Sequence, residues 1–148
     1  MSKKKEPPYE AARAVYDACL CLHAQRAARA LARRFDEAFR SLELTNNQFS
    51  LLMSLNRPEP PNMGWVSNVL AMDRTTLTAS LKVLERRGLV AVAVDAADRR
   101  SRRLALTAAG RRLLGRALPV WRRTHKAIER GLAPLDPDRL RAGMRALS

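Results

Sequence analysis

The segment from Trp65 to Gly110 constrains the fold of this chain more than any other part of the sequence. After a short apolar-periodic stretch, Asp73 precedes an Arg-Thr-Thr tripeptide, where its carboxylate can cap the free N–H groups of a helix start. Leucines then recur at helical spacing up to Gly88, a residue type that commonly ends helices. The spacing therefore predicts two short helices joined by a turn, the second with one buried face and one outward face.

A β-hairpin is predicted directly after the second helix. Valines alternate with alanines over residues 90–94, and leucines alternate again over 104–106, as they do in strands with one buried face. The tip between them, DAADRRSRR, holds four arginines and two aspartates. Two helices followed by a hairpin with a basic tip are typical of a winged helix-turn-helix. We therefore expect a mainly α fold with a small β-hairpin wing, a shape that binds DNA.

Two stretches carry a family resemblance: MDRTTLTASLKVLERRGLV and, after it, D-x-x-D-R-R-S-R-x-L-x-L-T-x-x-G. Together they resemble the MarR family of bacterial transcription regulators, and the similarity extends over nearly the whole chain. The resemblance implies a winged helix-turn-helix, an intertwined homodimer joined through its N- and C-terminal helices, and a regulator that is usually a repressor.

Helical patterns flank this segment on both sides. From Tyr9 to Leu42 the sequence has no Gly or Pro, which predicts one helix of about 50 Å at 1.5 Å per residue. After the hairpin, Thr107 can cap another helix, which Pro119 would bend or split, and Asp136-Pro137 opens a last one. These terminal helices have little of their own to pack on. We expect them to intertwine with a twin subunit, and a monomeric bundle is the alternative.

These patterns divide the chain into three parts. Residues 1–8 form a flexible basic arm. Residues 9–42 and 111–148 form a helical dimerisation region. Residues 43–110 form the winged helix-turn-helix DNA-binding domain.

The charge balance is strongly basic, with 28 Lys and Arg against 14 Asp and Glu and a formal net charge of +14. Nucleic acid is a natural counter-ion for such a chain, although a coding bias toward Arg and Ala would give a similar composition. The arginines gathered at the hairpin tip favour DNA. No run approaches the roughly 20 apolar residues of a membrane span, and the start lacks the apolar region of a secretory signal. We therefore expect a cytoplasmic protein that has no membrane partner.

The expected target is double-stranded DNA with a palindromic operator, because a symmetric dimer places its two recognition helices in successive major grooves about 34 Å apart. Hydroxyl groups on the outward helix face can bond base edges or phosphates, and threonine methyl groups can touch thymine. Many relatives carry a longer polar side chain where this chain has Ala79, so shape and wing contacts are expected to supply part of the specificity. The DNA-binding candidates are Arg74, Thr75, Thr76, Thr78, Ser80 and Lys82 in the helix, and Arg99 and Arg100 in the wing.

Asp95 and Asp98 bracket the wing turn and can hold neighbouring arginines in place. Arg99 or Arg100 would then reach the minor groove or its flanking phosphates, and the sequence leaves open which of the two does so. For Asp98 and one arginine, a purely structural clamp is the alternative to a role in DNA binding.

A small ligand is the first candidate signal. Cys21, Gln25 and Arg29 share one helical stripe, and Asn46 opens the next helix. In this family, aromatic acids and phenols bind at the hinge between the dimerisation and DNA-binding regions, so the resemblance implies a small aromatic acid or phenolic ligand. Arg29 would pair a carboxylate while Gln25 and Asn46 orient the molecule. A solvated helix arginine is the alternative for Arg29.

Sulfur is the second candidate signal. Cys19 and Cys21 lie two residues apart, so within one helix they point about 200° away from each other and cannot form a bridge. The segment LCLHAQRAARAL resembles the organic-peroxide-sensing branch, which implies a thiol-based redox-sensing repressor that uses Cys21. That branch holds its thiolate with tyrosine hydroxyls, whereas the matching places here carry Phe35 and Asn46. Small buried cysteines in a reduced compartment are the alternative.

The sequence does not favour an enzyme. His23 and Cys21 face apart on a helix, and no Gly-rich phosphate loop, paired-carboxylate cleft or metal-ligand spacing occurs. We therefore expect neither a cofactor nor a metal. A non-specific architectural DNA-binding protein is the remaining alternative, and the threonines clustered on the presented helix favour sequence reading over it.

Overall fold

The computed structural model describes residues 6–148 of the chain. Most of the predicted basic arm, residues 1–5, lies outside the described residues, and residues 6–8 are exposed. The elements are α1 (Tyr9–Ala18), α2 (Leu20–Phe39), the 3-10 helix η1 (Arg40–Leu42), α3 (Asn46–Ser54), α4 (Met63–Leu70), α5 (Arg74–Arg86), β1 (Val90–Val94), β2 (Arg102–Leu106), α6 (Ala108–Gly131) and α7 (Pro137–Ala146).

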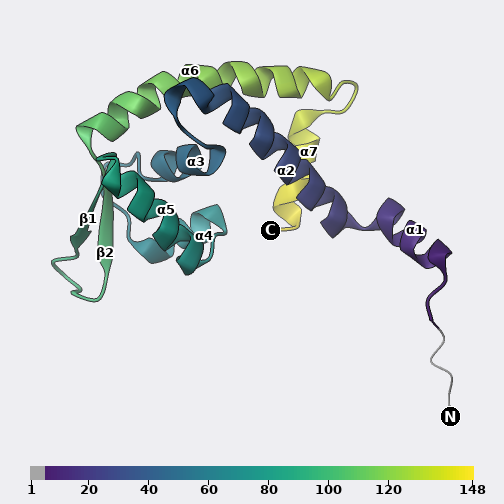
Figure 1. The fold of residues 1–148 in the computed structure, drawn as a ribbon, viewed down its shortest axis with the longest axis horizontal. Coiled ribbons are helices and arrows are strands. Elements are labelled where there is room, and N and C mark those ends of the chain that lie inside the picture. Colours follow the sequence, from purple (N-terminus) through teal and green to yellow (C-terminus); the bar gives the residue numbers. More distant parts are fainter. Residues whose placement is uncertain (1–5) are drawn as a thin grey trace, which may run out of the picture.

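A winged helix-turn-helix lies beneath α6, built from α3, α4, α5 and the β1–β2 hairpin (Figure 1). This confirms the predicted mainly α fold with a small β-hairpin wing. Apolar side chains from every one of these elements and from α2 meet in one buried cluster. The largest fully buried side chains of this core are Phe39, Leu51, Leu52, Leu55, Val66, Leu77, Leu84 and Leu104.

The wing is joined to the helix-turn-helix by a short third segment. Asn62 forms an isolated antiparallel bridge with Arg103, and the backbone N–H of Leu104 donates to the carbonyl of Pro61 at 2.9 Å. Because this bridge immediately precedes α4, the hairpin and the helix-turn-helix share backbone hydrogen bonds and form one rigid unit.

The two ends of the wing and the ends of two helices meet at one junction. Gly88 ends α5 with a φ of 69°, a left-handed conformation that suits glycine. The Thr107 hydroxyl donates to the Gly88 carbonyl at 2.7 Å and accepts from the Gly110 N–H at 3.0 Å, which caps α6 as predicted. The Thr107 N–H donates to the Leu89 carbonyl at 3.1 Å. One threonine therefore ties the end of α5, the start of β1 and the start of α6 together.

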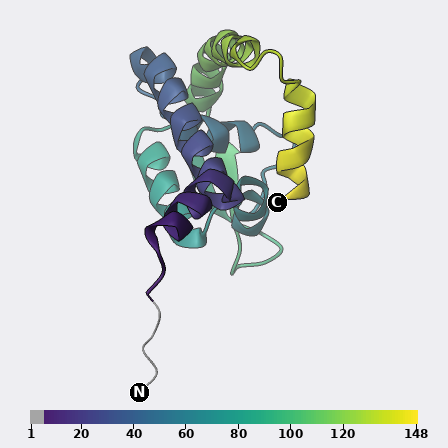
Figure 2. The same cartoon turned by 90° about the vertical axis from the view of Figure 1, so that its right-hand side faces the viewer.

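The prediction of one uninterrupted helix from Tyr9 to Leu42 is wrong. The chain leaves the helical conformation at Cys19, whose ψ of 108° is extended, so that α1 ends at Ala18 and α2 begins at Leu20. The Cys19 sulfur accepts the Leu22 N–H at 3.4 Å and so takes the place of an N-cap side chain. Figures 1 and 2 show α1 projecting away from the remaining helices, beyond the end of α2.

In contrast, Pro119 does not split the helix that follows the wing. The segment Ala108–Gly131 forms a single helix, α6, with Pro119 in its interior. Pro119 and Gly115, whose carbonyl would accept the missing N–H, are both exposed, so water can satisfy that carbonyl. Helix α2 packs against α6, and after the turn at Pro134 the chain forms α7, which an ion pair between Arg141 and Glu129 joins to α6 (Figure 1).

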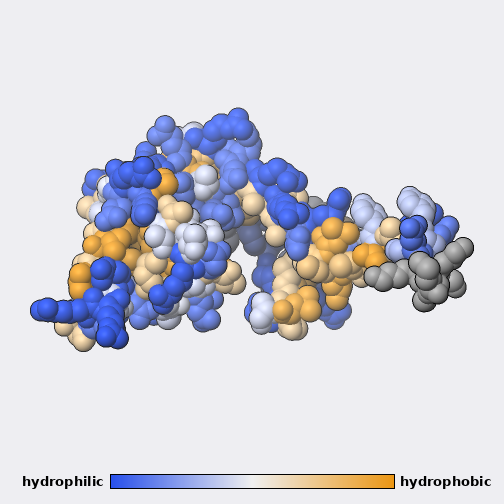
Figure 3. Space-filling model, turned by 60° about the horizontal axis from the view of Figure 1, so that its bottom comes forward, coloured by the Kyte–Doolittle hydropathy of each residue, from blue (hydrophilic) through white to orange (hydrophobic). Residues whose placement is uncertain are grey.

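Apolar side chains remain exposed on the terminal helices. In Figure 3 some of them form an orange area on the lobe that holds α2 and α7. The most exposed of them are Tyr9, Val15, Tyr16, Leu20, Leu135, Met144 and Leu147. None of the helices formed by residues 6–148 has the length and apolar content to cross a membrane.

Candidate nucleic-acid interface

Asp73 builds the start of α5. Its Oδ1 accepts the Thr76 N–H at 2.8 Å, and its Oδ2 accepts the Thr76 hydroxyl at 2.7 Å. These two bonds, that from the backbone N–H first, hold the pKa of Asp73 below its ordinary value. The carboxylate therefore stays ionised at neutral pH and continues to cap the helix.

The outward face of α5 brings together four of the predicted DNA-binding residues. Arg74, Thr75, Thr78 and Lys82 are all exposed, and with Ala79 they line a shallow hollow of about 420 Å³. The opposite face is anchored in the core by Leu77, Leu81 and Leu84.

Thr76 and Ser80, the two remaining helix candidates, are not among the residues that line this hollow. The Thr76 hydroxyl is engaged by Asp73, and Ser80 is half-buried on the flank of the helix. The structure therefore places four of the six candidates on one continuous surface.

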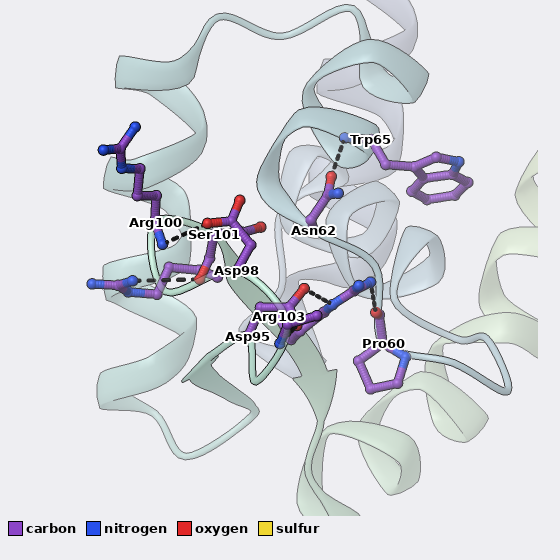
Figure 4. A network of polar contacts seen from close by, with 10 residues as sticks. Pro60, Asn62, Trp65, Asp95, Asp98, Arg100, Ser101 and Arg103 are labelled. Atoms are coloured by element: carbon purple, nitrogen blue, oxygen red, sulfur yellow. Dashed lines mark hydrogen bonds and ion pairs between the residues drawn. The ribbon is translucent and has the colours of Figure 1, made fainter.

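The wing tip presents exposed arginines on a turn that aspartates hold (Figure 4). Asp98 Oδ1 accepts the Arg100 N–H at 3.0 Å, and the Asp98 carbonyl accepts the Ser101 N–H at 2.9 Å. Asp98 thus orders the backbone of the turn, while the side chains of Arg99 and Arg100 remain exposed.

The ionic clamp of the wing involves Asp95 and Arg103, as expected for one of the two aspartates that bracket the turn, whereas the alternative clamp between Asp98 and an arginine is not among the ion pairs of residues 6–148. Asp95 Oδ2 lies 2.7 Å from Arg103 Nε, and Arg103 Nη1 donates to the Pro60 carbonyl at 3.1 Å (Figure 4). Asp95 is only 9% exposed. The Ala97 N–H, followed by Arg103, lowers the pKa of Asp95, so the clamp is charged at neutral pH.

Arg57 places a guanidinium group on the loop before α4. Arg57 stands over the indole of Trp65 at 4.2 Å from the ring centroid, a cation–π contact, and the backbone N–H of Trp65 donates to Asn62 Oδ1 at 2.8 Å. Together with Arg103 these residues line a cleft of about 180 Å³. Arg57 was not predicted, and Arg103 was expected only as one of the hairpin-tip arginines, because an arginine that stacks or bridges loops has no local sequence signature.

The predicted ligand residues form a partial cluster. Gln25 Nε2 lies 3.2 Å from the Cys21 sulfur, and Arg29 Nη2 donates to Gln25 Oε1 at 3.4 Å, so the expected stripe exists on the exposed surface of α2. Asn46 belongs to a separate contact, in which its backbone N–H donates to Asp36 Oδ1 at 2.7 Å. The structure thus brings Gln25 and Arg29 together but gives no hydrogen bond between either of them and Asn46 within residues 6–148.

The two cysteines are reduced and differ in exposure: Cys19 is half-buried and Cys21 is exposed. The alternative that both are buried is therefore wrong for Cys21. In the part of the chain that the structure describes, no three His, Cys, Asp or Glu side chains gather as a metal site would require.

An apolar cavity of about 410 Å³ opens between α3, α4 and α6. Phe49 and Trp121 line it with stacked rings whose centroids lie 6.4 Å apart, and Met53, Val69 and Leu70 complete most of its wall. It adjoins the helix that precedes the recognition helix. The sequence analysis did not predict it, since its lining comes from three helices that are far apart in the chain.

Comparisons with known proteins agree with this fold and surface. Residues 42–101 match the MarR family. The chain is 39% identical over 71 residues to the transcriptional activatory protein BadR of Rhodopseudomonas palustris, in a match that spans 46% of this chain and 41% of BadR.

Two solved structures cover most of the chain. One is the Mycobacterium tuberculosis transcriptional regulator MosR in complex with DNA, at 37% identity and a TM-score of 0.79, with 87% of this chain and 92% of MosR covered. Another is the transcriptional repressor CouR bound to a DNA duplex, at 28% identity and a TM-score of 0.80, with 90% of this chain and 94% of CouR covered.

Proposed function

Since this chain belongs to the MarR family of transcription regulators, we propose that it binds an inverted-repeat operator in double-stranded DNA as a homodimer. The observation that carries the proposal is the shared surface of α5 and the wing. The exposed Arg74 and Lys82 lie on the outward face of α5, and the exposed Arg99 and Arg100 lie on the wing tip. Both elements lie on the side of the molecule away from α6 (Figure 1). A helix of this kind fits a major groove, and a basic hairpin beside it reaches the adjoining minor groove.

The exposed apolar faces of the terminal helices support the homodimer. Leu140 and Met144 are exposed on α7, and Leu147 is exposed just after its end. Val15 and Tyr16 are exposed on α1, which projects from the rest of the subunit. Large apolar side chains that one subunit leaves in solvent mark surfaces at which subunits associate. A second copy would supply the same helices in return, and a twofold axis would then relate the two recognition helices.

The proposed mode of regulation is repression, in which the bound dimer occludes the promoter. The two named relatives differ in this respect, because CouR is a repressor and BadR is activatory. A reporter gene placed behind the operator, with and without the protein, measures the sign directly.

The proposal is tested by selecting bound duplexes from a random DNA pool. We expect an inverted repeat whose half-sites are one helical turn apart, and we expect unrelated DNA to compete poorly in a gel shift. Selection of no shared sequence, with equal competition by unrelated DNA, would establish a non-specific architectural protein instead.

For the signal, we propose a small aromatic acid or phenol. The Gln25–Arg29 pair on α2 and the apolar cavity between α3, α4 and α6 are the two places that suit one. Calorimetry with benzoate- and cinnamate-type compounds measures binding, and Arg29→Ala separates the places. Loss of heat in this variant locates a carboxylate at Arg29, whereas unchanged heat locates the ring in the apolar cavity.

Thiol oxidation is a second candidate signal, favoured by the break between α1 and α2. Within one helix, two cysteines that are two residues apart point in different directions and cannot form a disulfide. Cys19 lies outside the regular helix, so this restriction does not apply to it. The exposed Cys21 thiolate would attack the O–O bond of an organic hydroperoxide, giving a sulfenic acid and an alcohol. Cys19 would then displace water to form a disulfide. Mass spectrometry after stoichiometric peroxide, with Cys21→Ser as control, tests this.

A further inference from the structure

We propose that the recognition helix reads thymine methyl groups in the major groove, with Thr78 and Ala79 as its specificity-determining residues. The inference rests on the proposed function, in which α5 enters a major groove. It goes further by naming the chemical group that the helix recognises, and it assigns the polar side chains of α5 a supporting role.

The hydroxyl hydrogens of two outward threonines already have acceptors within the protein. Thr76 Oγ1 donates to Asp73 Oδ2 at 2.7 Å, and Thr78 Oγ1 donates to the Arg74 carbonyl at 2.7 Å. A hydroxyl carries a single hydrogen, so neither group has one left to donate to the N7 or O6 acceptors of purines. Donation to a base would first require a satisfied bond at the start of α5 to break.

With its hydroxyl turned back to the helix, Thr78 has its methyl group left to offer a base. Thr78 is exposed and lines the hollow of about 420 Å³ on the outward face of α5. Its neighbour Ala79 adds a second methyl group and no polar atom beyond the backbone. The groups that Thr78 and Ala79 offer to a base at the centre of this surface are therefore methyl groups.

Charged side chains flank these methyl groups. Arg74 stands at the first position of α5 and Lys82 lies one turn beyond Thr78, and both line the same hollow. Flexible cations in these positions suit the phosphates on the two sides of a groove, while the floor between them receives a base edge.

Thymine is the base whose major-groove edge carries an apolar group, its 5-methyl. The methyl groups of Thr78 and Ala79 exclude water from that methyl, whereas the Thr78 hydroxyl, whose hydrogen bonds the Arg74 carbonyl, has none to donate to the N7 or O6 acceptors of a purine. Each half-site should thus contain one or two thymines that face Thr78 and Ala79, and discrimination there should come from contact rather than from hydrogen bonding.

The experiment replaces each thymine of one half-site by deoxyuridine, which removes only the methyl group. We expect affinity in fluorescence anisotropy to fall about three- to tenfold at one or two positions, the scale of taking one or two methyl groups out of contact. Replacement of thymines elsewhere should change affinity less than about twofold. Equal affinity for all uridine duplexes overturns the inference, while the proposed function stands as long as the unmodified operator binds.

Two isosteric variants identify the protein side of the contact. Thr78→Val keeps the methyl group and replaces the hydroxyl, so it should bind the thymine operator within about twofold of the parent. Thr78→Ser keeps the hydroxyl and removes the methyl group, so it should lose about three- to tenfold and discriminate thymine from uracil less. The reverse order of the two variants would show reading by the hydroxyl and would overturn the inference.

Ala79→Gly provides an independent measure, because it removes the second methyl group and should also reduce thymine discrimination. Thermal unfolding of each variant confirms the fold. Arg100→Ala serves as the matched control, since loss of a wing contact should weaken the thymine and uridine duplexes by the same factor. If Arg100→Ala instead alters the ratio between them, discrimination resides outside α5 and the inference fails.

Discussion

At the scale of single residues, Gly110 shows how closely two backbones approach beneath the wing. A Cβ atom at this position would lie 2.2 Å from the Leu89 carbonyl oxygen and 3.3 Å from a Leu106 methyl carbon. The first contact is with backbone, which has little freedom to move at the start of β1. Only glycine allows α6 to begin this close to the hairpin.

Replacement of Gly110 should therefore lower the stability of the fold, whereas the same replacement at a glycine with open space around it should not. Gly110→Ala should lower the free energy of unfolding by about 1–3 kcal/mol or more, as overpacking does in other cores. Gly115→Ala is the matched control, because a Cβ there meets nothing within 4 Å and the position is an exposed helix interior. It should raise stability by about 0.5–1 kcal/mol. Urea unfolding measures both, and equal effects would contradict the close approach.

Arg100 is the residue whose removal should affect DNA binding without affecting the fold. Its side chain is exposed, and only its backbone N–H is bonded to Asp98. If Arg100 contacts a phosphate, Arg100→Ala should weaken operator binding and reduce the slope of log affinity against log salt by about one. Arg122→Ala, an exposed arginine on α6, is the control. An unchanged affinity and slope would remove Arg100 from the interface.

At the scale of elements, the start of α5 depends on the charge of Asp73. Its lowered pKa means that the cap stabilises the folded state above the ordinary value of 3.8 and loses this contribution as the pH falls through the lowered pKa. Operator binding should thus be independent of Asp73 titration from neutral pH down to about pH 5.

Thr76→Val tests the origin of this shift. It removes the hydroxyl that donates to Asp73 but keeps the backbone N–H, which is the larger cause. The pKa of Asp73 should therefore rise in the variant and still remain below its ordinary value. Carboxyl titration by NMR measures it, and a complete return to the ordinary value would contradict the leading role of the backbone bond.

Several helix starts could be predicted because their signals are local. Asp73, Thr107 and Asp136 each accept a backbone N–H two or three residues ahead, as the sequence indicates. The break at Cys19 had no such signal, since no Gly or Pro stands there and a thiol is an unusual cap. The break lies at a position that no local residue signal of the usual kind marks.

The pairing within the wing clamp and the apolar cavity could not be predicted from the sequence, because both depend on how separate elements meet in the fold. Which aspartate meets which arginine depends on strand register, and here Arg103 pairs across from Ala93, beside Asp95 rather than Asp98. The cavity needs α3, α4 and α6 together. The exposed face of α5 was predicted from helical periodicity, but the engagement of the Thr76 and Thr78 hydroxyls was not, because rotamers are chosen by neighbouring backbone groups.

At the scale of the whole molecule, the terminal helices should determine the assembly. Leu140 and Met144 lie one turn apart on α7, Leu147 follows directly after its end, and Met144 is 46% exposed. In the proposed homodimer, a charge placed on this face would be buried between subunits, at a large desolvation cost.

Met144→Glu should therefore shift the protein from dimer to monomer at micromolar concentration, as measured by light scattering. Arg145→Gln alters the net charge by the same amount at the adjacent exposed residue and should leave the dimer intact. Both variants should keep the thermal transition of the winged helix-turn-helix. A dimeric Met144→Glu variant would mean that α7 lies outside the subunit interface.

The threonine junction at the base of the wing has a mechanical consequence. Thr107 bonds the Gly88 and Leu89 carbonyls, and its hydroxyl also caps α6, so the long helix and the reading elements have no flexible linker between them. A small tilt of α6 would then rotate α5 and the hairpin together, by the same angle, about an axis near residue 107. Any signal that changes the angle between the two α6 helices of the proposed dimer would thus alter the distance between its two winged helix-turn-helix units. Each unit would keep its internal shape.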